Sequence, residues 1–325
     1  MNYLIQNIYS LLMAFLENLC GFQCFAQLVA GCVLLNFVWG CWNLVYIYCL
    51  GKFPDFHKYG KWSVVTGGTD GIGLAFVNKL AALGQNVVII SRNPEKVKNV
   101  ATGVAKEYNV ETKQIAVDFG RSDIYQNIAK DLEGLDVGTL VNNVGTGFEP
   151  LTFLEFADQP QMVEKVIAVN AESLAKMTQI ILPQMVEKRR GIVINMGSAG
   201  GIYPTPFVSM YSATKMFVDC FSKCMHSEYS DKGIISMSIM PFTVSTKMTH
   251  NPSTNLIVLT PANYVSSALK TIGRCRRSYG CLSHAIQGKV IEALPDFLVS
   301  WFVYNMFSTK RQHELKFRES ASKTQ

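Results

Sequence analysis

One short stretch does most to limit how this chain can fold: an apolar run that leads through a glycine-rich loop into a helical pattern. Residues 62–66 form a short β-rich run, and residues 74–83 show helical spacing. The loop between them consists of Gly67, Gly68, Thr69, Asp70, Gly71, Ile72 and Gly73. Glycine lets the backbone turn sharply and approach a pyrophosphate, and a helix N-terminus offers free N–H groups to an anion. A tight structural turn is the alternative, but the flanking strand and helix favour a dinucleotide site.

Alternating strand and helix patterns continue beyond this loop and define the expected fold class. Further apolar runs of strand length lie at 86–90, 191–196 and 234–240. Such alternation predicts an α/β fold, Rossmann-like, with a doubly wound parallel sheet that helices cover on both faces. We expect residues 61–287 to form a single catalytic domain, since doubly wound folds of this length are often one unit.

The residue after the second strand indicates which dinucleotide this domain binds. The run 86–90 ends at Ser91-Arg92-Asn93, where an NAD-binding fold usually has Asp or Glu. A carboxylate there binds the ribose 2′-hydroxyl, whereas Arg accommodates a 2′-phosphate. We therefore predict NADP(H) as the cofactor, with Arg92 at the phosphate. The alternative for Arg92 is a solvated charge ahead of a helix that Asn93 and Pro94 begin.

Tyr211 and Lys215 form the candidate chemical pair, at a spacing of four in another helical pattern. Residues four apart are neighbours on a helix, so an ordinary amphipathic helix is the alternative for so common a pair. A cation beside a phenol favours its ionised form and lowers its pKa, so the pair predicts a tuned proton donor. Ser198 lies thirteen residues earlier, just after the run 191–196, and would present its hydroxyl to a substrate carbonyl.

Together these motifs resemble those of the short-chain dehydrogenase/reductase family over residues 61 to about 285. The matching residues are Thr66, Gly67, Gly71, Ile72, Gly73, Asp118, Asn142, Asn143, Val144, Gly145, Asn170, Ser198, Tyr211 and Lys215. The resemblance implies that Asp118 contacts the adenine and that Asn142 to Gly145 shape the floor of the cofactor site. It also implies that Asn170 holds a water linking Lys215 to solvent. Without the resemblance, the default interpretation of Asp118 and of Asn170 would be a helix cap or a hydrogen-bonded buried polar group.

The family's mechanism then gives roles to the catalytic set Asn170, Ser198, Tyr211 and Lys215. Ser198 and Tyr211 would hydrogen-bond a substrate carbonyl, NADPH would deliver hydride to its carbon, and Tyr211 would protonate the developing alkoxide. Lys215 would lower the pKa of Tyr211 and, as in the family, bind the nicotinamide ribose.

The segment after the sixth strand falls where the family binds the nicotinamide carboxamide. It spans Thr243 to Thr246 and follows Pro241. Two departures from the family pattern lie nearby, because Phe242 stands where many members have Gly, and Gly197 stands where Ser often precedes the catalytic Ser. Neither removes a reacting group, and both would reshape the pocket. The predicted cofactor-binding residues are Gly67, Thr69, Asp70, Gly71, Ile72, Gly73, Arg92, Asp118, Asn143, Tyr211, Lys215, Val244 and Thr246.

The first 51 residues differ from the rest, because Glu17 is their only charged side chain. The uncharged stretch from Asn18 to Gly51 is longer than the roughly 20 residues that a helix needs to cross the hydrocarbon core. Residues 1–51 are therefore predicted to be a membrane anchor, formed by one tilted span or by two helices, the first near 3–16. A cleaved signal peptide would have a basic n-region and a small-residue cleavage site, and neither is present.

Basic residues follow the anchor directly and predict its orientation. Lys52 and Lys58 lie in an expected linker, 52–60, and Lys61 follows it, whereas the amino-terminal side of the apolar run has no Lys or Arg. The positive-inside bias then places the catalytic domain in the cytosol.

The carboxyl-terminal part of the chain is apolar and then basic. Residues 288–309 are rich in aromatic side chains and carry few charges, so we expect them to lie on the bilayer or to cover the substrate pocket. The tail, 310–325, would face anionic headgroups or remain solvated.

Charge and cysteine usage exclude several other functions. The net charge of +6 is modest and no nucleic-acid motif accompanies it, so nucleic acid is not expected as a partner. Nine cysteines show no disulfide framework. Cys220 and Cys224 lack further ligands at metal-binding spacing, so we expect no metal site and assign them to the core or to a subunit contact in a homodimer.

The anchor and four motifs resemble one branch of the family. The motifs are 117–119, 142–145, 210–215 and 244–248. They are similar to the membrane-bound 17β-hydroxysteroid dehydrogenases of types 3 and 12, a branch that includes very-long-chain 3-oxoacyl-CoA reductases. That resemblance implies the endoplasmic reticulum membrane and a lipophilic carbonyl substrate.

Three functional hypotheses follow from this resemblance. A 17-ketosteroid reductase is the first, and a 3-oxoacyl-CoA reductase of fatty-acid elongation is the second. The third is an inactive membrane scaffold, which the intact catalytic residues oppose. A steroid needs a closed apolar slot, whereas an acyl-CoA needs an open channel with cations for its phosphates. Residues 242–310 would form the mouth of the substrate pocket, and their sequence does not decide between the two substrates.

Overall fold

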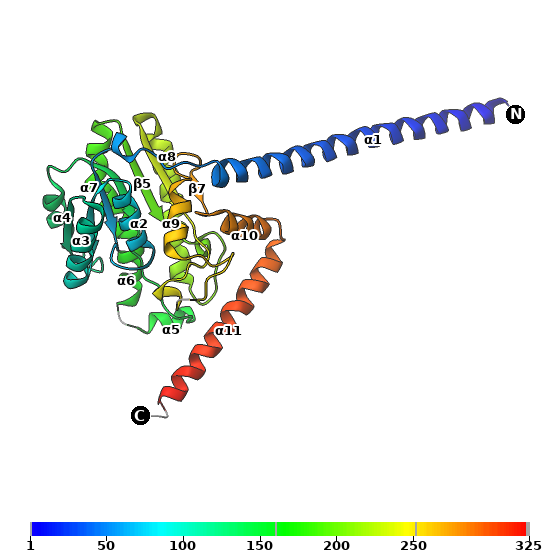
Figure 1. Ribbon diagram of the computed structural model, residues 1–325. Coiled ribbons are helices and arrows are strands. Elements are labelled where there is room, and N and C mark those ends of the chain that lie inside the picture. The colour runs from blue at the N-terminus through cyan, green and yellow to red at the C-terminus, as the bar shows by residue number, and fades with distance from the viewer. Residues whose placement is uncertain (1, 160, 251, 323–325) are drawn as a thin grey trace. The chain divides into compact units, whose positions relative to one another are not determined.

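The computed structural model describes residues 2–159, 161–250 and 252–322. The chain divides into two compact units, Met1–Leu50 and Gly51–Gln325. Figure 1 shows both units, with helices and strands labelled where there is room.

The first unit is a long helix, α1 (Asn2–Leu44), that ends in a wider π-helical turn, Val45–Cys49. Phe22–Cys49 is a stretch of 28 residues with a mean hydropathy of 1.8, and its side chains are not buried. This stretch is long and apolar enough to cross a membrane. Of the two arrangements expected for the anchor, the structure has one continuous helix, because no residue within α1 breaks its backbone hydrogen bonds.

The described residues of the second unit form a seven-stranded parallel sheet in the order β3-β2-β1-β4-β5-β6-β7. The strands are β1 (Trp62–Thr66), β2 (Asn86–Ser91), β3 (Thr112–Ala116), β4 (Val137–Asn142), β5 (Gly191–Met196), β6 (Ile234–Ile239) and β7 (Arg277–Ser278). The predicted doubly wound α/β fold is confirmed. The strand order reverses between β1 and β4, and in open parallel sheets such a switch point is where ligands bind.

Helices cover both faces of this sheet (Figure 1). They are α2 (Gly71–Ala82), α3 (Pro94–Tyr108), α4 (Tyr125–Leu132), α5 (Phe153–Ala157), α6 (Met162–Ile167), α7 (Ser173–Glu187), α8 (Ser209–Tyr229), α9 (Pro261–Leu269), α10 (Leu282–Glu292) and α11 (Asp296–Ser322). A π-helical turn, Ala168–Glu172, joins α6 to α7.

The alternation of side chains along the strands creates two apolar cores. Val65 and Ile89 pack with α2, α3 and α9 on one face, and Val64 and Ile90 pack with α4 and α7 on the other. Because both faces are covered, these strands are apolar at nearly every position, which is why the runs were recognisable in the sequence.

Two helix starts near the sheet edge follow local capping rules. The Asp70 carboxylate accepts a hydrogen bond from the Gly71 N–H at 2.9 Å and begins α2. Asn93 accepts from the Lys96 N–H at 3.0 Å and, with Pro94, begins α3 as the sequence predicts. Helix α2 starts three residues earlier than its apolar spacing indicates, because the last glycines of the loop form its first turn.

Candidate active site

The ends of β1 and β4 are tied together where the strand order reverses. The Thr66 hydroxyl accepts hydrogen bonds from the backbone N–H groups of Asn143 and Val144, both at 3.0 Å. The Asn143 amide donates to the carbonyl oxygens of Thr66 at 2.9 Å and Gly67 at 3.3 Å. Asn143 therefore holds the glycine loop in place from the neighbouring strand.

The glycine loop has a shape that only glycine allows. Gly67 and Gly71 have φ angles of +67° and +53°, in the left-handed region. A Cβ atom at Gly73 would collide with the carbonyl oxygen of Gly67 and the amide of Asn143. The loop and the first turn of α2 thus form a tight backbone cradle that fits the pyrophosphate of a dinucleotide.

The residues predicted for the adenosine end lie at the carboxyl ends of β2 and β3. The hydroxyls of Thr69 and Ser91 are hydrogen-bonded at 2.8 Å, which joins the glycine loop to the end of β2. Arg92 is the next residue and is exposed. Asp118 follows β3 and is half-buried, and its carboxylate accepts from the Gly120 N–H at 2.9 Å. Parallel pairing of β1, β2 and β3 brings these side chains to one edge of the sheet.

Ser198 and Tyr211 meet at the carboxyl end of β5. Ser198 begins a short turn after β5, and its hydroxyl accepts from the Gly200 N–H at 3.2 Å. The Ser198 hydroxyl lies close to the Tyr211 phenol, which projects from the first turn of α8. Burial raises the pKa of Tyr211, and the nearby Ser198 hydroxyl acts in the opposite direction.

Lys215 is buried one turn beyond Tyr211, but it does not act on the phenol as we expected. Its ammonium group donates to the carbonyl oxygen of Met196 at 3.0 Å and lies 5.7 Å from the centre of the Tyr211 ring. Burial lowers the pKa of Lys215 to about 8. The predicted lowering of the Tyr211 pKa is therefore wrong for this geometry, because desolvation of the phenol outweighs the favourable contacts.

Asn170 lies in the π-helical turn between α6 and α7 and is buried. Its side-chain oxygen accepts from the Thr146 N–H at 2.7 Å, and its amide donates to the Thr146 carbonyl at 3.0 Å and the Thr214 hydroxyl at 3.1 Å. A Cβ atom built on Gly145 would lie 3.2 Å from the Lys215 nitrogen and 3.5 Å from the Asn170 oxygen. Asn170 and Lys215 thus converge on Gly145, and π-helical turns of this kind are frequent at functional sites.

The segment after β6 lies beside both parts of the site. The Pro241 carbonyl accepts from the Ala199 N–H at 2.8 Å, which joins this segment to the turn that carries Ser198. Phe242 stacks on Tyr279 with ring centres 5.7 Å apart and meets the His284 ring edge-on at 5.9 Å. The residue that departs from the family pattern is therefore part of an aromatic wall.

Farther along this segment, the chain reaches the glycine loop. Val244 is buried, and the Thr246 methyl group lies 3.3 Å from a Cβ atom built on Gly71. Lys247 pairs with the Asp70 carboxylate at 2.6 Å, and this contact lowers the pKa of Asp70. The predicted cofactor residues Asp70, Gly71 and Thr246 are therefore neighbours in space.

Sequence reasoning missed a polar network beneath the site. The Asn142 amide donates to Asn195 at 2.8 Å and to Thr178 at 3.1 Å, and the Asn195 amide donates to Ser222 at 2.9 Å. These side chains join β4 and β5 to α7 and α8 inside the fold. Asn142 and Asn195, each in an otherwise apolar strand, could have indicated this network from the sequence. The Asp70–Lys247 pair had no such signal, because its partners are 177 residues apart.

Two features outside the site also bear on the sequence predictions. Cys220 and Cys224 are exposed on α8, so their assignment to the core is wrong and the subunit contact remains a prediction. Among the described residues, no three His, Cys, Asp or Glu side chains gather where they could hold a metal ion.

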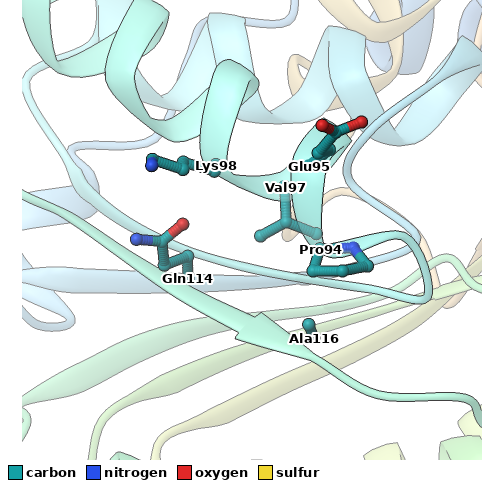
Figure 2. Close-up of a pocket in the computed structure, with 6 residues that line it drawn as sticks. All are labelled: Pro94, Glu95, Val97, Lys98, Gln114 and Ala116. Atoms are coloured by element: carbon teal, nitrogen blue, oxygen red, sulfur yellow. The ribbon is translucent and has the colours of Figure 1, made fainter.

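A hollow of about 370 Å³ lies between the start of α3 and the edge strand β3. Figure 2 shows the six residues that line it. They are Pro94, Glu95, Val97, Lys98, Gln114 and Ala116. None of them is among the predicted catalytic or cofactor residues, so we assign this hollow no part in the chemistry.

The fold and site together define an oxidoreductase of the Rossmann-like class, and comparison with known proteins names its family. A family model described as short chain dehydrogenase matches residues 61–256. The chain therefore belongs to the short-chain dehydrogenase family.

Relatives with curated names extend this result. The very-long-chain 3-oxoacyl-CoA reductase of Homo sapiens is 43% identical over 258 residues, which cover 79% of this chain and 83% of that protein. The very-long-chain 3-oxoacyl-CoA reductase-B of Danio rerio is 41% identical over 283 residues, covering 86% and 91%.

Solved structures show the same fold. A 7beta-hydroxysteroid dehydrogenase is 26% identical with a TM-score of 0.70, covering 76% of this chain and 98% of that one. A metagenomic short-chain oxidoreductase in complex with NADP is 25% identical with a TM-score of 0.57, covering 67% and 95%.

Proposed function

We propose that this protein is an NADPH-dependent reductase of a keto group on a lipophilic substrate, and that the substrate is a long-chain 3-oxoacyl-CoA. The observation that carries the chemistry is the close approach of the Ser198 hydroxyl and the Tyr211 phenol near the glycine cradle. The two curated relatives named above, at 43% and 41% identity, favour the 3-oxoacyl-CoA over the 17-ketosteroid, which is the first hypothesis from the sequence alone.

The reacting groups have distinct tasks. Ser198 and Tyr211 would hydrogen-bond the carbonyl oxygen of the substrate and stabilise the negative charge that develops on it. NADPH, when bound, supplies the hydride to the carbonyl carbon. Tyr211 would give its phenolic proton to the oxygen. Because burial raises its pKa, the phenol carries this proton at neutral pH, and reduction requires the protonated form.

Lys215 and Asn170 would restore the proton to Tyr211. The pKa of Lys215 is lowered to about 8, so its ammonium group releases a proton more readily than an exposed lysine does. Asn170 lies beside it at Gly145, where it would hold a water that connects Lys215 to solvent. Lys215 would also bind the nicotinamide ribose.

The cofactor would extend along the carboxyl edge of the sheet. The glycine loop would receive its pyrophosphate, Asn143 would hold that loop, and the segment containing Val244 and Thr246 would bind the carboxamide. Asp118 would contact the adenine, and Arg92 would bind the 2′-phosphate. The exposed guanidinium of Arg92 next to the Thr69–Ser91 hydrogen bond supports NADP(H). So does the NADP bound by a similar short-chain oxidoreductase.

A 17-ketosteroid is the second candidate substrate. The 7beta-hydroxysteroid dehydrogenase that shares this fold acts on a steroid. In this chain, the half-buried Phe242 ring, backed by the buried ring of Tyr279, lies near the turn that carries Ser198, and an apolar ring there suits a fused ring system. An inactive scaffold is disfavoured, because the residues of the catalytic set are all present and close together.

We further propose that the protein resides in the endoplasmic reticulum membrane with its catalytic domain in the cytosol. The apolar stretch Phe22–Cys49 supports the membrane location. Lys52, Lys58 and Lys61 follow this stretch directly, which supports the orientation.

A substrate comparison tests the proposed function. Membranes that contain the full chain would receive NADPH with either a long-chain 3-oxoacyl-CoA or a 17-ketosteroid, and NADPH consumption would be followed by absorbance. We expect a higher kcat/KM with the acyl-CoA. Faster turnover of the steroid would make the 17-ketosteroid the assigned substrate. Background rates of NADPH consumption with both substrates would refute the proposal that the protein is a reductase of either substrate.

A further inference from the structure

The last two helices expose an apolar surface that the chemistry of the site does not use. We define the α10–α11 surface as the outward side chains of these consecutive helices (Figure 1), Leu282, Ile286, Val290, Leu294, Phe297, Leu298, Trp301, Phe302 and Met306. On α11, Phe297, Trp301 and Phe302 are 71%, 67% and 62% exposed. Soluble monomers rarely expose so many neighbouring large apolar side chains.

The opposite side of α11 is attached to the catalytic domain, so the exposure does not come from a detached helix. The Tyr304 ring lies 5.4 Å from the ring of Phe207. Arg311 donates to the Glu155 carboxylate at 2.6 Å, and its guanidinium lies 5.8 Å from the Phe207 ring. Two separate contacts therefore fix which face of α11 points outward.

Phe207 connects this helix to the active site. It lies between Ser198 and Tyr211 and has a φ of +68°, a strained conformation for a bulky side chain. Its carbonyl accepts from the Leu151 N–H at 2.8 Å. The α10–α11 surface is thus one packed layer away from the segment that carries the catalytic groups.

We propose that the α10–α11 surface rests on a lipid bilayer. Its side chains are of the kinds that settle at the boundary between acyl chains and headgroups, with phenylalanines and a tryptophan. Lys310 and Lys316 follow on the same helix, are exposed, and suit anionic headgroups. In addition, the second unit begins at Gly51, directly after the apolar stretch Phe22–Cys49, so the chain itself keeps this unit within reach of the bilayer.

A bilayer explains this surface better than a second copy of the chain does. A face buried between copies is depleted of lysine, whereas Lys310 and Lys316 are exposed on α11 directly after the aromatic residues. If the proposed function holds, a lipophilic substrate would then reach the Phe207 side of the site directly from the lipid.

Photolabelling from the lipid phase tests the proposal without relying on activity. The full chain would be placed in nanodiscs of phosphatidylcholine and phosphatidylserine that contain a lipid with a diazirine on its acyl chain. After irradiation, labelled peptides would be identified by mass spectrometry. Peptides from 22–49 serve as the positive control. Peptides from α8 serve as the matched control, because Met216 and Phe217 are exposed and apolar there.

We expect labelling of 282–306 well above that of α8. Replacing Trp301 and Phe302 together by Ser should lower it severalfold, whereas Phe217→Ser should leave it unchanged. Binding of NADPH by each variant would show that the fold is intact. Labelling of 282–306 no higher than that of α8, or cross-links joining this surface on two copies of the chain, would overturn the proposal.

Discussion

The cofactor half of the catalytic domain, residues 61–145, and the substrate half, residues 191–322, contribute to the site through different parts of the chain. In the cofactor half the proposed binding surface is backbone, because Gly67, Gly71 and Gly73 form a cradle that leaves no room for side chains. In the substrate half, by contrast, the proposed reacting atoms belong to side chains, those of Ser198 and Tyr211.

This difference teaches what each half tolerates. An added methyl group in the cofactor half changes the shape of the backbone and should disturb binding and stability together. Removing a single oxygen atom in the substrate half leaves the packing intact and should disturb only the reaction. Variants in each half and at their junction would show whether binding and reaction separate in this way.

Tyr211→Phe should give the largest effect and leave the cofactor half untouched. Loss of the transferable proton should lower kcat by about 10²- to 10⁴-fold. The dissociation constant of NADPH, measured by fluorescence titration, should stay close to that of the wild type. Weakened NADPH binding in this variant would show that the two halves are not separable.

Gly73→Ala should show the opposite behaviour. Its Cβ would collide with the Gly67 carbonyl and the Asn143 amide, so we expect a loss of about 1–3 kcal/mol in the free energy of unfolding and loss of NADPH binding. Gly103→Ala is the matched control, because Gly103 lies in α3 with nothing within 4 Å of an added Cβ. It should stabilise the protein by about 0.5–1 kcal/mol. Thermal unfolding would measure both stability changes. Equal changes in the two variants would contradict the proposal that Gly73 is required for the cradle.

Arg92→Asp should change which cofactor is preferred while retaining activity. Losing a charged contact to the 2′-phosphate, worth about 1.5–3 kcal/mol, should lower the ratio of kcat/KM for NADPH to that for NADH by about 10- to 100-fold. Lys98→Asp makes the same change in net charge at an exposed position of α3 and should leave the ratio unchanged. If both variants shift the ratio equally, Arg92 does not bind the phosphate.

Lys215 should make stability depend on pH in alkaline solution. Its folded pKa of about 8 lies below the ordinary value of 10.5, so the folded state disfavours the charged form. Below about pH 8 this cost is fully present, and between about pH 8 and 10.5 it is relieved, so the wild type should gain stability with rising pH. Lys215→Met should lack this gain. Melting temperatures would be measured in detergent micelles between about pH 8 and 10.5. If those of the wild type and of Lys215→Met changed in parallel, the Lys215 ammonium group would not be desolvated in the folded state.

The Asp70–Lys247 pair joins the two halves and should give the smallest effect. Both side chains are substantially exposed, at 47% and 71%, and such pairs contribute about 0–1 kcal/mol. Lys247→Ala should therefore speed NADPH dissociation in stopped-flow measurements by no more than about fivefold. High salt should remove the difference. A much larger effect would mean that Lys247 contacts the cofactor itself.

Much of the cofactor half could be predicted from the sequence because its features are local. The predicted run 62–66 has the same bounds as β1 in the structure, since strands covered on both faces must be apolar throughout. The glycine loop was recognisable because positive φ angles and close backbone approach demand glycine at fixed positions.

The substrate half was less predictable because its properties depend on distant neighbours. The raised pKa of Tyr211 depends on how much solvent the surrounding segments exclude, and helical spacing does not encode this. The contact of Lys215 with Met196 needs the register of α8 against β5. Likewise, an apolar sequence at 288–309 does not reveal which face of α11 packs against Phe207 and which face is exposed.

Transfer of deuterium from the cofactor would test whether this chain reduces a 3-oxoacyl-CoA with the Tyr211 proton and the NADPH hydride. The full chain in nanodiscs would receive NADPH deuterated at the transferring position of nicotinamide C4, together with a long-chain 3-oxoacyl-CoA, and the product would be analysed by mass spectrometry. The account predicts a 3-hydroxyacyl-CoA with one deuterium on the carbon that carried the keto oxygen, and almost none of this product with Tyr211→Phe. A product without deuterium, or equal yields from the two proteins, would contradict it.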